Sequence, residues 1–261
     1  VSRETFTMDP LFLLLPAGAF FAGLVDAVVG GGGLIQIPLL FSTFPGAAPA
    51  TLFGTNKLAS VVGTTSAAIR YGRRIQIPWR IAGPAALAAG GGSWLGARAV
   101  SLFPPAALRP LILVLLIAVA IYTFLRKDFG ISHQRLADPR RELQLALAIG
   151  AGLGFYDGFF GPGTGSFLIF LFIRLLQMDF LHASVMAKIV NVSTNLAAIA
   201  FFVAHGEIFW QVAGVMALSN LAGSQVGSAL ALRYGAAFIR KAFLVVVVVL
   251  ILRFSADTFL A

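Results

Sequence analysis

Four ionisable residues lie inside strongly apolar stretches of the sequence, and they are the residues best suited to chemistry. They are Lys57 in GTNKLAS, Lys188 in AKIVNVSTN, Asp26 in GLVDAVVGGGG and Asp157 in GFYDGFFGPGTG. A charged side chain at the centre of a bilayer costs roughly 2.5–3.5 kcal/mol on insertion scales, so it normally serves a function or meets a partner. The two lysines favour an anion-binding site, unless their ammonium groups reach the membrane interface. The two aspartates predict either charge pairing with a lysine or proton coupling.

Polar residues follow both lysines at helical spacing. Residues three and seven positions apart share one face of an α-helix, so each lysine belongs to a polar stripe. The stripes consist of Lys188, Asn191 and Asn195, and of Lys57, Ser60 and Thr64 with Asn56 beside the lysine. Such a stripe lines either a cavity or an interhelical contact. We favour the cavity, and we expect the same role for Asn220 and Gln225 in a later apolar stretch.

A glycine run follows each aspartate. The runs contain Gly30, Gly31, Gly32 and Gly33 in the first case, and Gly161, Gly163, Thr164 and Gly165 in the second. A chain reversal followed at once by a helix leaves free N–H groups and the positive end of a helix dipole. Irregular backbone inside a membrane survives only against protein or a water-filled cavity. We therefore predict that both turns bind an anion, with close helix packing as the alternative. Packing is our interpretation of GSWLG (92–96) and GSQVG (223–227).

The second half of the chain repeats the first at one constant offset, which equals the separation of Asp26 and Asp157. The same offset relates Lys57 to Lys188, Gly92 to Gly223, Gly96 to Gly227 and Arg109 to Arg240. We predict two homologous repeats, residues 1–126 and 142–261. The polar segment 127–141 is then the linker between them.

Composition excludes a soluble globular domain. Of the 261 residues, 59% are hydrophobic and 11% are charged, and the mean hydropathy is +0.91. We predict an all-α, multi-pass (polytopic) membrane protein, and we expect no removable signal peptide. The apolar segments cover residues 10–29, 34–44, 50–69, 81–103, 108–125, 143–160, 166–177, 183–204, 208–232 and 238–256.

The remaining composition limits the partners. The chain has no cysteine and three scattered histidines, so we expect no metal and no other cofactor. The net charge is +9, but the arginines concentrate in short loops and at segment ends, where they meet lipid head groups. We therefore expect membrane lipid and no nucleic acid as a partner; the oligomeric state is not predicted. No nucleophile, base and orienting residue can be assembled, which disfavours an enzyme.

The basic residues also predict the topology. Lys and Arg are abundant in loops 70–80, 126–141 and 233–241 and absent from loops 103–108 and 204–208. Short basic loops stay in the cytoplasm, so loop 70–80 lies inside while its repeat partner 201–211 lies outside. An odd number of crossings per repeat follows, which makes the repeats inverted. Each would be a glycine-tipped broken helix or helical hairpin followed by three transmembrane helices, with a cytoplasmic linker and both termini outside. A parallel arrangement of four spans per repeat is the alternative.

The motifs GLVDAVVGGGGLIQIP, GTNKLAS, GFYDGFFGPGTGSF and AKIVNVSTN occur in this order and together span most of the chain. They resemble the sulfite exporter TauE/SafE family of membrane transporters, and most closely its YfcA-type members. The resemblance implies a transporter in the bacterial inner membrane for sulfite, thiosulfate, sulfonates such as sulfoacetate, or related organosulfur anions. It implies neither a particular substrate nor a direction.

The leading hypothesis is therefore a secondary transporter for a small sulfur-containing anion, with one site built from both glycine turns and both lysine-bearing segments. An anion channel of the same architecture is the alternative, and an intramembrane enzyme is a third hypothesis from another class. Saturable flux distinguishes a transporter from a channel. A chemically altered product would identify an enzyme.

Overall fold

The computed structural model describes residues 10–103, 105–125 and 138–234, and these residues form helices and no strand. The first part contains α1 (Pro10–Val29), α2 (Gly33–Thr43), α3 (Pro49–Gly72), α4 (Trp79–Ser101) and α5 (Pro105–Leu125). The second contains α6 (Pro139–Phe159), α7 (Thr164–Leu176), α8 (Phe180–Ala204) and α9 (Trp210–Tyr234). Most of the predicted linker, the predicted segment 238–256 and both termini lie outside the described residues.

The helix starts repeat at the offset found in the sequence. The separation of Asp26 and Asp157 also relates the first residues of α2, α3 and α4 to the first residues of α7, α8 and α9. Local signals explain some of these starts: Pro49 occupies the first turn of α3, where its missing N–H is harmless. Asp179 caps α8, since its Oδ1 accepts the N–H groups of Leu181 and His182 at 2.9 and 3.0 Å.

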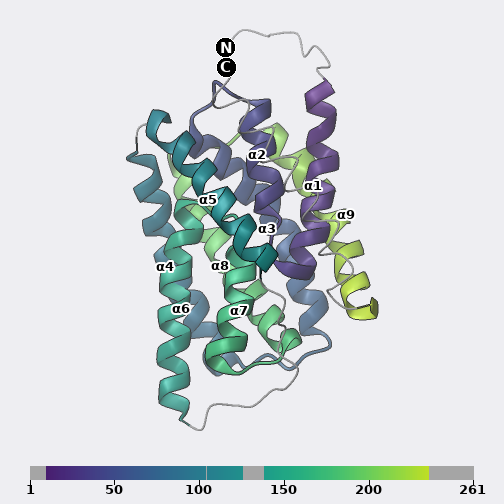
Figure 1. Cartoon of the computed structure of the whole chain (residues 1–261), viewed down its shortest axis with the longest axis vertical. Coiled ribbons are helices and arrows are strands. Elements are labelled where there is room, and N and C mark those ends of the chain that lie inside the picture. The colour runs from purple at the N-terminus through teal and green to yellow at the C-terminus, as the bar shows by residue number, and fades with distance from the viewer. Residues whose placement is uncertain (1–9, 104, 126–137, 235–261) are drawn as a thin grey trace.

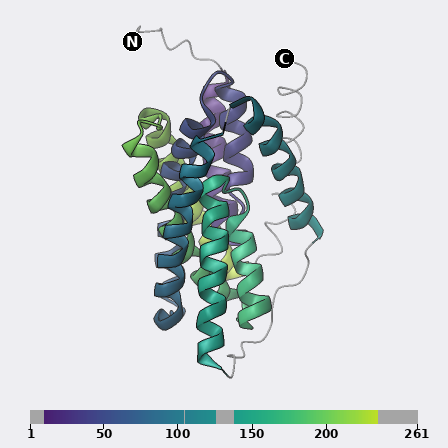
Figure 2. The same cartoon turned by 90° about the vertical axis from the view of Figure 1, so that its left-hand side faces the viewer.

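Two helical hairpins enter the bundle from opposite ends. In Figure 1, α1 begins at the top and runs down, whereas α6 begins at the bottom and runs up. In Figure 2, α1 and α2 lie in the upper half and α7 lies in the lower half. Helix α2 has 11 residues and α7 has 13, so each is roughly 17–20 Å long at 1.5 Å per residue. These arms are therefore too short to cross the ~30 Å hydrocarbon core of a bilayer.

The turns of the two hairpins touch each other inside the bundle. The N–H of Ser166 donates to the Gly30 carbonyl at 3.2 Å, and the Ser166 hydroxyl donates to the Val29 carbonyl at 2.6 Å. Gly30 has a φ of +77°, and a Cβ there would overlap the backbone of Gly165. Glycine is thus required at this contact on two grounds: backbone conformation and space.

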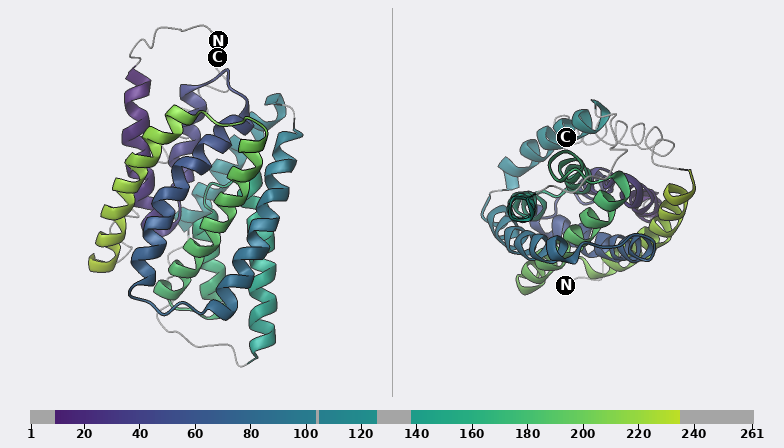
Figure 3. Two further views of the ribbon diagram at one scale, coloured as in Figure 1. Left: turned by 180° about the vertical axis from the view of Figure 1, so that it is seen from behind. Right: turned by 90° about the horizontal axis from the view of Figure 1, so that it is seen from below.

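The helices of the two halves alternate in the bundle. Seen from behind, α9, α3, α8 and α4 lie side by side (Figure 3, left), and α1 packs against α9 as α6 packs against α4. Each half therefore completes the packing of the other.

Small residues make these contacts close. Gly92 and Gly96 of α4 lie against α6, and Gly223 and Gly227 of α9 lie against α1; a Cβ at any of the four would overlap a facing carbonyl oxygen. The hydroxyls of Ser93 and Ser224 donate to carbonyls of Thr194 and Gly63 at 2.7 and 2.6 Å. The GSWLG and GSQVG motifs are helix-contact faces, as predicted.

Two helices of the described residues are long and apolar enough to cross a membrane, judged by length and composition. They are Phe180–Ala204 and Trp210–Arg233. Shorter apolar helices are Leu14–Val29, Gly33–Thr43, Pro110–Val119 and Thr164–Leu176.

Candidate anion site at the hairpin turns

The four charged residues singled out in the sequence form two buried ion pairs, and both pairs cross between the halves. Lys57 Nζ of α3 lies 2.5 Å from Asp157 Oδ2 of α6, with side-chain exposures of 3% and 2%. Lys188 Nζ of α8 lies 3.2 Å from Asp26 Oδ2 of α1, with exposures of 2% and 16%, and also donates to the Asp26 carbonyl. Each lysine therefore meets the aspartate of the other half. Of the two roles expected for the aspartates, this is the paired arrangement; proton coupling stays a prediction.

The first pair lies against the second hairpin turn. A Cβ at Gly161 would lie 3.0 Å from Lys57 Nζ, so the ammonium group is in contact with the turn. Tyr156 closes that turn, because its hydroxyl donates to the Pro162 carbonyl at 2.7 Å. Thr164 is also used within the turn, since its hydroxyl donates to the Gly161 carbonyl at 2.8 Å.

The second pair lies at the end of α1, just before the first turn. Asp26 Oδ2 also accepts the hydroxyl of Thr64 at 3.1 Å, and the Asp26 carbonyl accepts the N–H of Gly30 at 3.0 Å. A Cβ at Gly32 would lie 2.9 Å from the Asp26 Cβ, so the carboxylate and the turn are adjacent.

Several backbone N–H groups of the two turns donate no hydrogen bond within the described residues. They belong to Gly31, Gly32, Gly33, Gly163 and Gly165. Unpaired backbone donors are rare inside proteins because each carries the free-energy cost of a lost hydrogen bond. At the start of a helix such donors and the helix dipole together favour an anion. The turns therefore offer the groups that the glycine runs predicted.

Two buried amide side chains, one in the helix turn that follows the first glycine run and one next to Lys57 in the sequence, are incompletely paired. Gln36 of α2 is fully buried: its Oε1 accepts the Ser60 hydroxyl at 2.8 Å, and its Nε2 has no partner among the described residues. Asn56, 4% exposed, has no partner for Oδ1 in the same part of the chain. Sequence reasoning missed Gln36, although a glutamine in the first turn after four glycines was a usable signal. Buried unpaired amides mark places where a polar ligand would be stabilised.

The asparagine stripe of α8 is internally bonded. Asn195 Nδ2 donates to Asn191 Oδ1 at 2.8 Å, and both side chains are buried. Two other polar residues differ from expectation. Asn220 serves an interhelical contact, with Nδ2 donating to the Ala19 carbonyl at 3.3 Å, and Gln225 is exposed on the outer face. Asn220 therefore makes a helix contact, whereas Gln225 lines a surface cavity away from the hairpin turns, because helical periodicity does not tell which neighbour covers a face.

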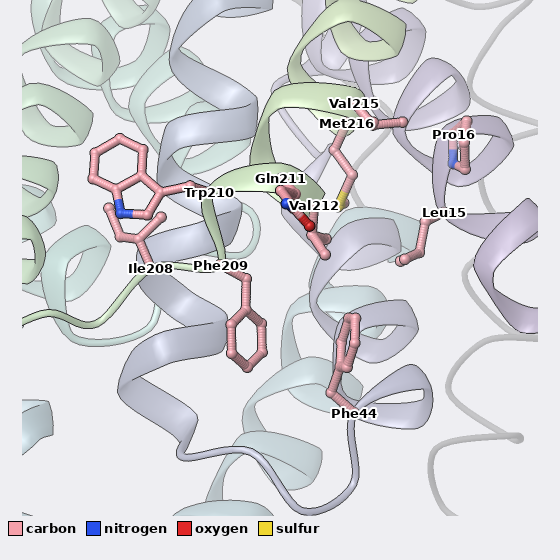
Figure 4. Close-up of a pocket in the computed structure, with 10 residues that line it drawn as sticks. All are labelled: Leu15, Pro16, Phe44, Ile208, Phe209, Trp210, Gln211, Val212, Val215 and Met216. Carbon is pink, nitrogen blue, oxygen red and sulfur yellow. The ribbon is translucent and has the colours of Figure 1, made fainter. Parts of the chain in front are cut away.

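A cavity of about 580 Å³ lies away from these pairs, between α1, the end of α2 and the start of α9 (Figure 4). Its lining is almost entirely apolar and includes Phe44, Phe209, Trp210 and Met216. None of its described lining residues is ionisable, so it is unsuited to an anion. The Lys57–Asp157 pair is closed to solvent, whereas the Asp26 side chain of the second pair is partly exposed.

Comparison with known proteins shows which class of protein the chain resembles. The chain is 36% identical over 249 residues to a probable membrane transporter protein, ORF9, of Sinorhizobium, covering 95% of this chain and 93% of that protein. It is 34% identical to a probable membrane transporter protein of Haemophilus influenzae (89% of each chain) and 32% identical to the probable membrane transporter protein YfcA of Escherichia coli K12 (98% and 94%). These similarities indicate a membrane transporter rather than an enzyme, as predicted.

The family follows from the same comparison. The model of the sulfite exporter TauE/SafE family matches residues 15–254. The chain belongs to this family, as its four motifs predicted. No solved structure matches the chain.

Proposed function

We propose that the chain is a secondary transporter that moves a small sulfur-containing anion across the bacterial inner membrane, as a multi-pass protein. The observation that carries the proposal is the pair of crossed, buried Lys–Asp contacts at the hairpin turns. A lysine that pairs with an aspartate of the other half can exchange that carboxylate for an anionic substrate. The name of the family is consistent with sulfite as one such anion.

The substrate would be bound by the two turns and the two lysine-bearing helices. The proposed ligands are Gly30, Gly31, Gly32, Gly33, Asn56, Lys57, Gly161, Gly163, Thr164, Gly165, Lys188, Asn191 and Asn195. Each hydrogen bond from a charged group would contribute roughly 1.5–3 kcal/mol, and the free N–H groups of the turns would add neutral donors. Gln36 joins this set because its Nε2 donor is buried without a partner among the described residues.

Substrate binding would also loosen the contact between the halves. When the anion takes the place of Asp157 at Lys57, one link between α3 and α6 is lost, and the same holds for Asp26 and Lys188. Asp26 and Asp157 are the proposed sites of proton coupling, and opening of one hairpin at a time would give alternating access.

We further propose that the repeats are inverted. The opposite directions of α1 and α6 support this (Figure 1), as does the position of the basic residues. The loop after α3, which contains Arg73, and the start of α6 lie at the lower end, whereas the loop before α9, which contains Glu207, lies at the upper end. Single cysteines introduced into this cysteine-free chain test the arrangement: position 73 should react from the cytoplasm and position 207 from the outside. Reaction of both from one side would disprove it.

The substrate is tested by flux into proteoliposomes. Sulfite, thiosulfate, sulfoacetate, taurine and sulfate are compared, each with and without a proton gradient. The proposal predicts that one or more sulfur anions enter saturably and that a gradient changes the rate. Flux proportional to concentration, without saturation or coupling, would favour an anion channel. Absence of flux for every anion of the panel would contradict the substrate class.

A further inference from the structure

A basic groove lies on the outer face of the molecule between the second halves of α3 and α9. One cavity of about 510 Å³ is lined by Ser66, Arg70, Arg73, Arg74 and Gln225 among others, and an adjoining one of about 400 Å³ adds Arg233. The side chains are arranged by hydrogen bonds, since Arg70 donates to Gln225 Oε1 and Gln225 Nε2 donates to the Ser66 hydroxyl. We call this feature the arginine groove.

The arginine groove has no acidic residue on either of the helices that form it. The sequence contains no Asp or Glu between Asp26 and Asp128, and none between Glu207 and Asp257. The Asp26 carboxylate, on neighbouring α1, is engaged by Lys188 and Thr64. The positive charge of Arg70, Arg73 and Arg74 is therefore not compensated by a carboxylate of α3 or α9, and an arginine presents several N–H donors to an external anion.

The apolar wall beside the arginines suits an acyl chain. Val62 and Ile69 of α3 and Val226 of α9 are exposed, and Val62 and Ile69 line the same cavity as the arginines. An isolated anion would need only the basic end of such a groove. A ligand that fits both parts carries an anionic phosphate and a hydrocarbon chain.

The groove breaks the symmetry of the repeat. At the offset that relates Asp26 to Asp157, Arg70 corresponds to Phe201, and Gln225 corresponds to Trp94. In the equivalent place between α8 and α4, Trp94 and Phe201 pack edge to face with ring centroids 5.4 Å apart. One position thus holds an aromatic pair and the other a hollow basic groove, so the groove is not an automatic result of the helix packing.

We infer that the arginine groove binds the head group of an anionic glycerophospholipid, such as phosphatidylglycerol, with an acyl chain along Val62 and Ile69. The inference rests on placement of the chain in a membrane with this end at the cytoplasmic leaflet. Arginines at a membrane surface attract anionic lipid, and a groove adds a fixed position for the phosphate.

The test uses the purified full chain in a neutral detergent. Lipid binding is measured by native mass spectrometry, and thermal unfolding is followed with phosphatidylglycerol, with phosphatidylcholine of the same acyl chains, or with inorganic phosphate. The wild-type protein should bind phosphatidylglycerol about tenfold or more tightly than phosphatidylcholine. The triple variant Arg70→Gln/Arg73→Gln/Arg74→Gln should lose this preference. The control Arg80→Gln/Arg140→Gln/Arg141→Gln, which removes the same charge from exposed arginines at the same end, should keep it.

A second variant keeps the test informative if the triple variant does not fold. Arg70→Phe/Gln225→Trp copies the aromatic pair that Phe201 and Trp94 form between α8 and α4, and it should fold while losing the preference for phosphatidylglycerol. Equal loss in the groove and control triples, or an unchanged preference in the copied-pair variant, would overturn the inference. Binding of inorganic phosphate as strong as that of the lipid would also overturn it in favour of a free-anion site. The lipid-binding experiment measures no transport, so a negative result would not contradict the proposed anion site at the hairpin turns. A negative result in the flux experiment would likewise not contradict lipid binding in the arginine groove.

Discussion

Replacing Lys57 with alanine should destabilise the fold because it leaves the carboxylate of Asp157 buried without a cation. The two side chains are 3% and 2% exposed, so water cannot replace the lost partner. Breaking a buried ion pair by removing one partner costs about 3–5 kcal/mol, whereas replacing both partners with apolar residues is often neutral. The double variant Lys57→Ala/Asp157→Ala should therefore be about as stable as the wild type, apart from a packing loss. If Asp157→Ala costs a similar amount, the coupling free energy of the pair, which is the cost of the double variant minus the two single costs, has a magnitude of roughly 6–10 kcal/mol before the packing loss is counted.

The crossed geometry is measured by a double-mutant cycle. The free energy of unfolding is determined in detergent for Lys57→Ala, for Asp157→Ala and for their combination. The matched control combines Lys57→Ala with Asp26→Ala, which removes the aspartate of the same half. The control pair should couple much more weakly, because Lys57 forms its ion pair with Asp157 and Asp26 forms its own with Lys188. Strong coupling of Lys57 to Asp26 and weak coupling to Asp157 would show that the pairs form within each half. That result would refute the crossed pairing of Lys57 with Asp157.

Three further predictions concern single positions. Gly30→Ala should cost at least roughly 1–3 kcal/mol of unfolding free energy, because Gly30 has a positive φ and its Cα faces the second turn. The control Gly46→Ala should change that free energy by no more than about 0.5 kcal/mol, because a Cβ at Gly46 would meet no atom of the described residues within 4 Å. Equal effects of the two substitutions in unfolding assays would contradict the turn contact. Burial alone would raise the pKa of the Asp179 carboxyl, but hydrogen bonds from the first turn of α8 lower that pKa below its usual value. The cap therefore contributes its full stabilisation of the folded state above the unfolded pKa of about 4. That contribution is lost as the pH falls through the lower pKa of the folded state. Asp179→Ala should thus cost about 1 kcal/mol near neutral pH and progressively less in acid; a cost that is independent of pH in thermal unfolding would exclude this role. Lys188→Ala should weaken the anion-dependent rise in melting temperature more than Lys57→Ala does, because two asparagines follow it on one helical face; an unchanged response would remove Lys188 from the site.

The helices and their order could be predicted from the sequence to a large extent. The predicted segments 34–44, 81–103 and 208–232 agree with α2, α4 and α9 to within two residues at each end. This succeeds because apolar runs bounded by glycine and proline define helices locally, and because the constant offset between the halves gives each boundary twice. The glycine contacts of α4 and α9 were predictable for the same reason.

The pairing of the charges could not be predicted. Lys57 is much nearer in the sequence to Asp26 than to Asp157, and only the packing of α6 against α4 and α8, which in turn contact α3, brings Asp157 to it. The repeat makes the ambiguity complete, since pairing within or between the halves would leave the same sequence pattern. The outward position of Gln225 could not be predicted for a similar reason. A polar residue in an apolar helix can face an internal cavity, a neighbouring helix or a polar groove on the outer surface.

The central claim is that the crossed lysine–aspartate pairs at the hairpin turns bind the transported anion. It is tested most directly by flux through the double variant Lys57→Ala/Asp157→Ala, which is expected to remain folded. With the sulfur anion that the wild-type protein transports best in proteoliposomes, the variant should lose saturable flux by a factor of about ten or more, which corresponds to one charge-assisted hydrogen bond. Saturable flux equal to that of the wild type, from the folded variant, would contradict the claim.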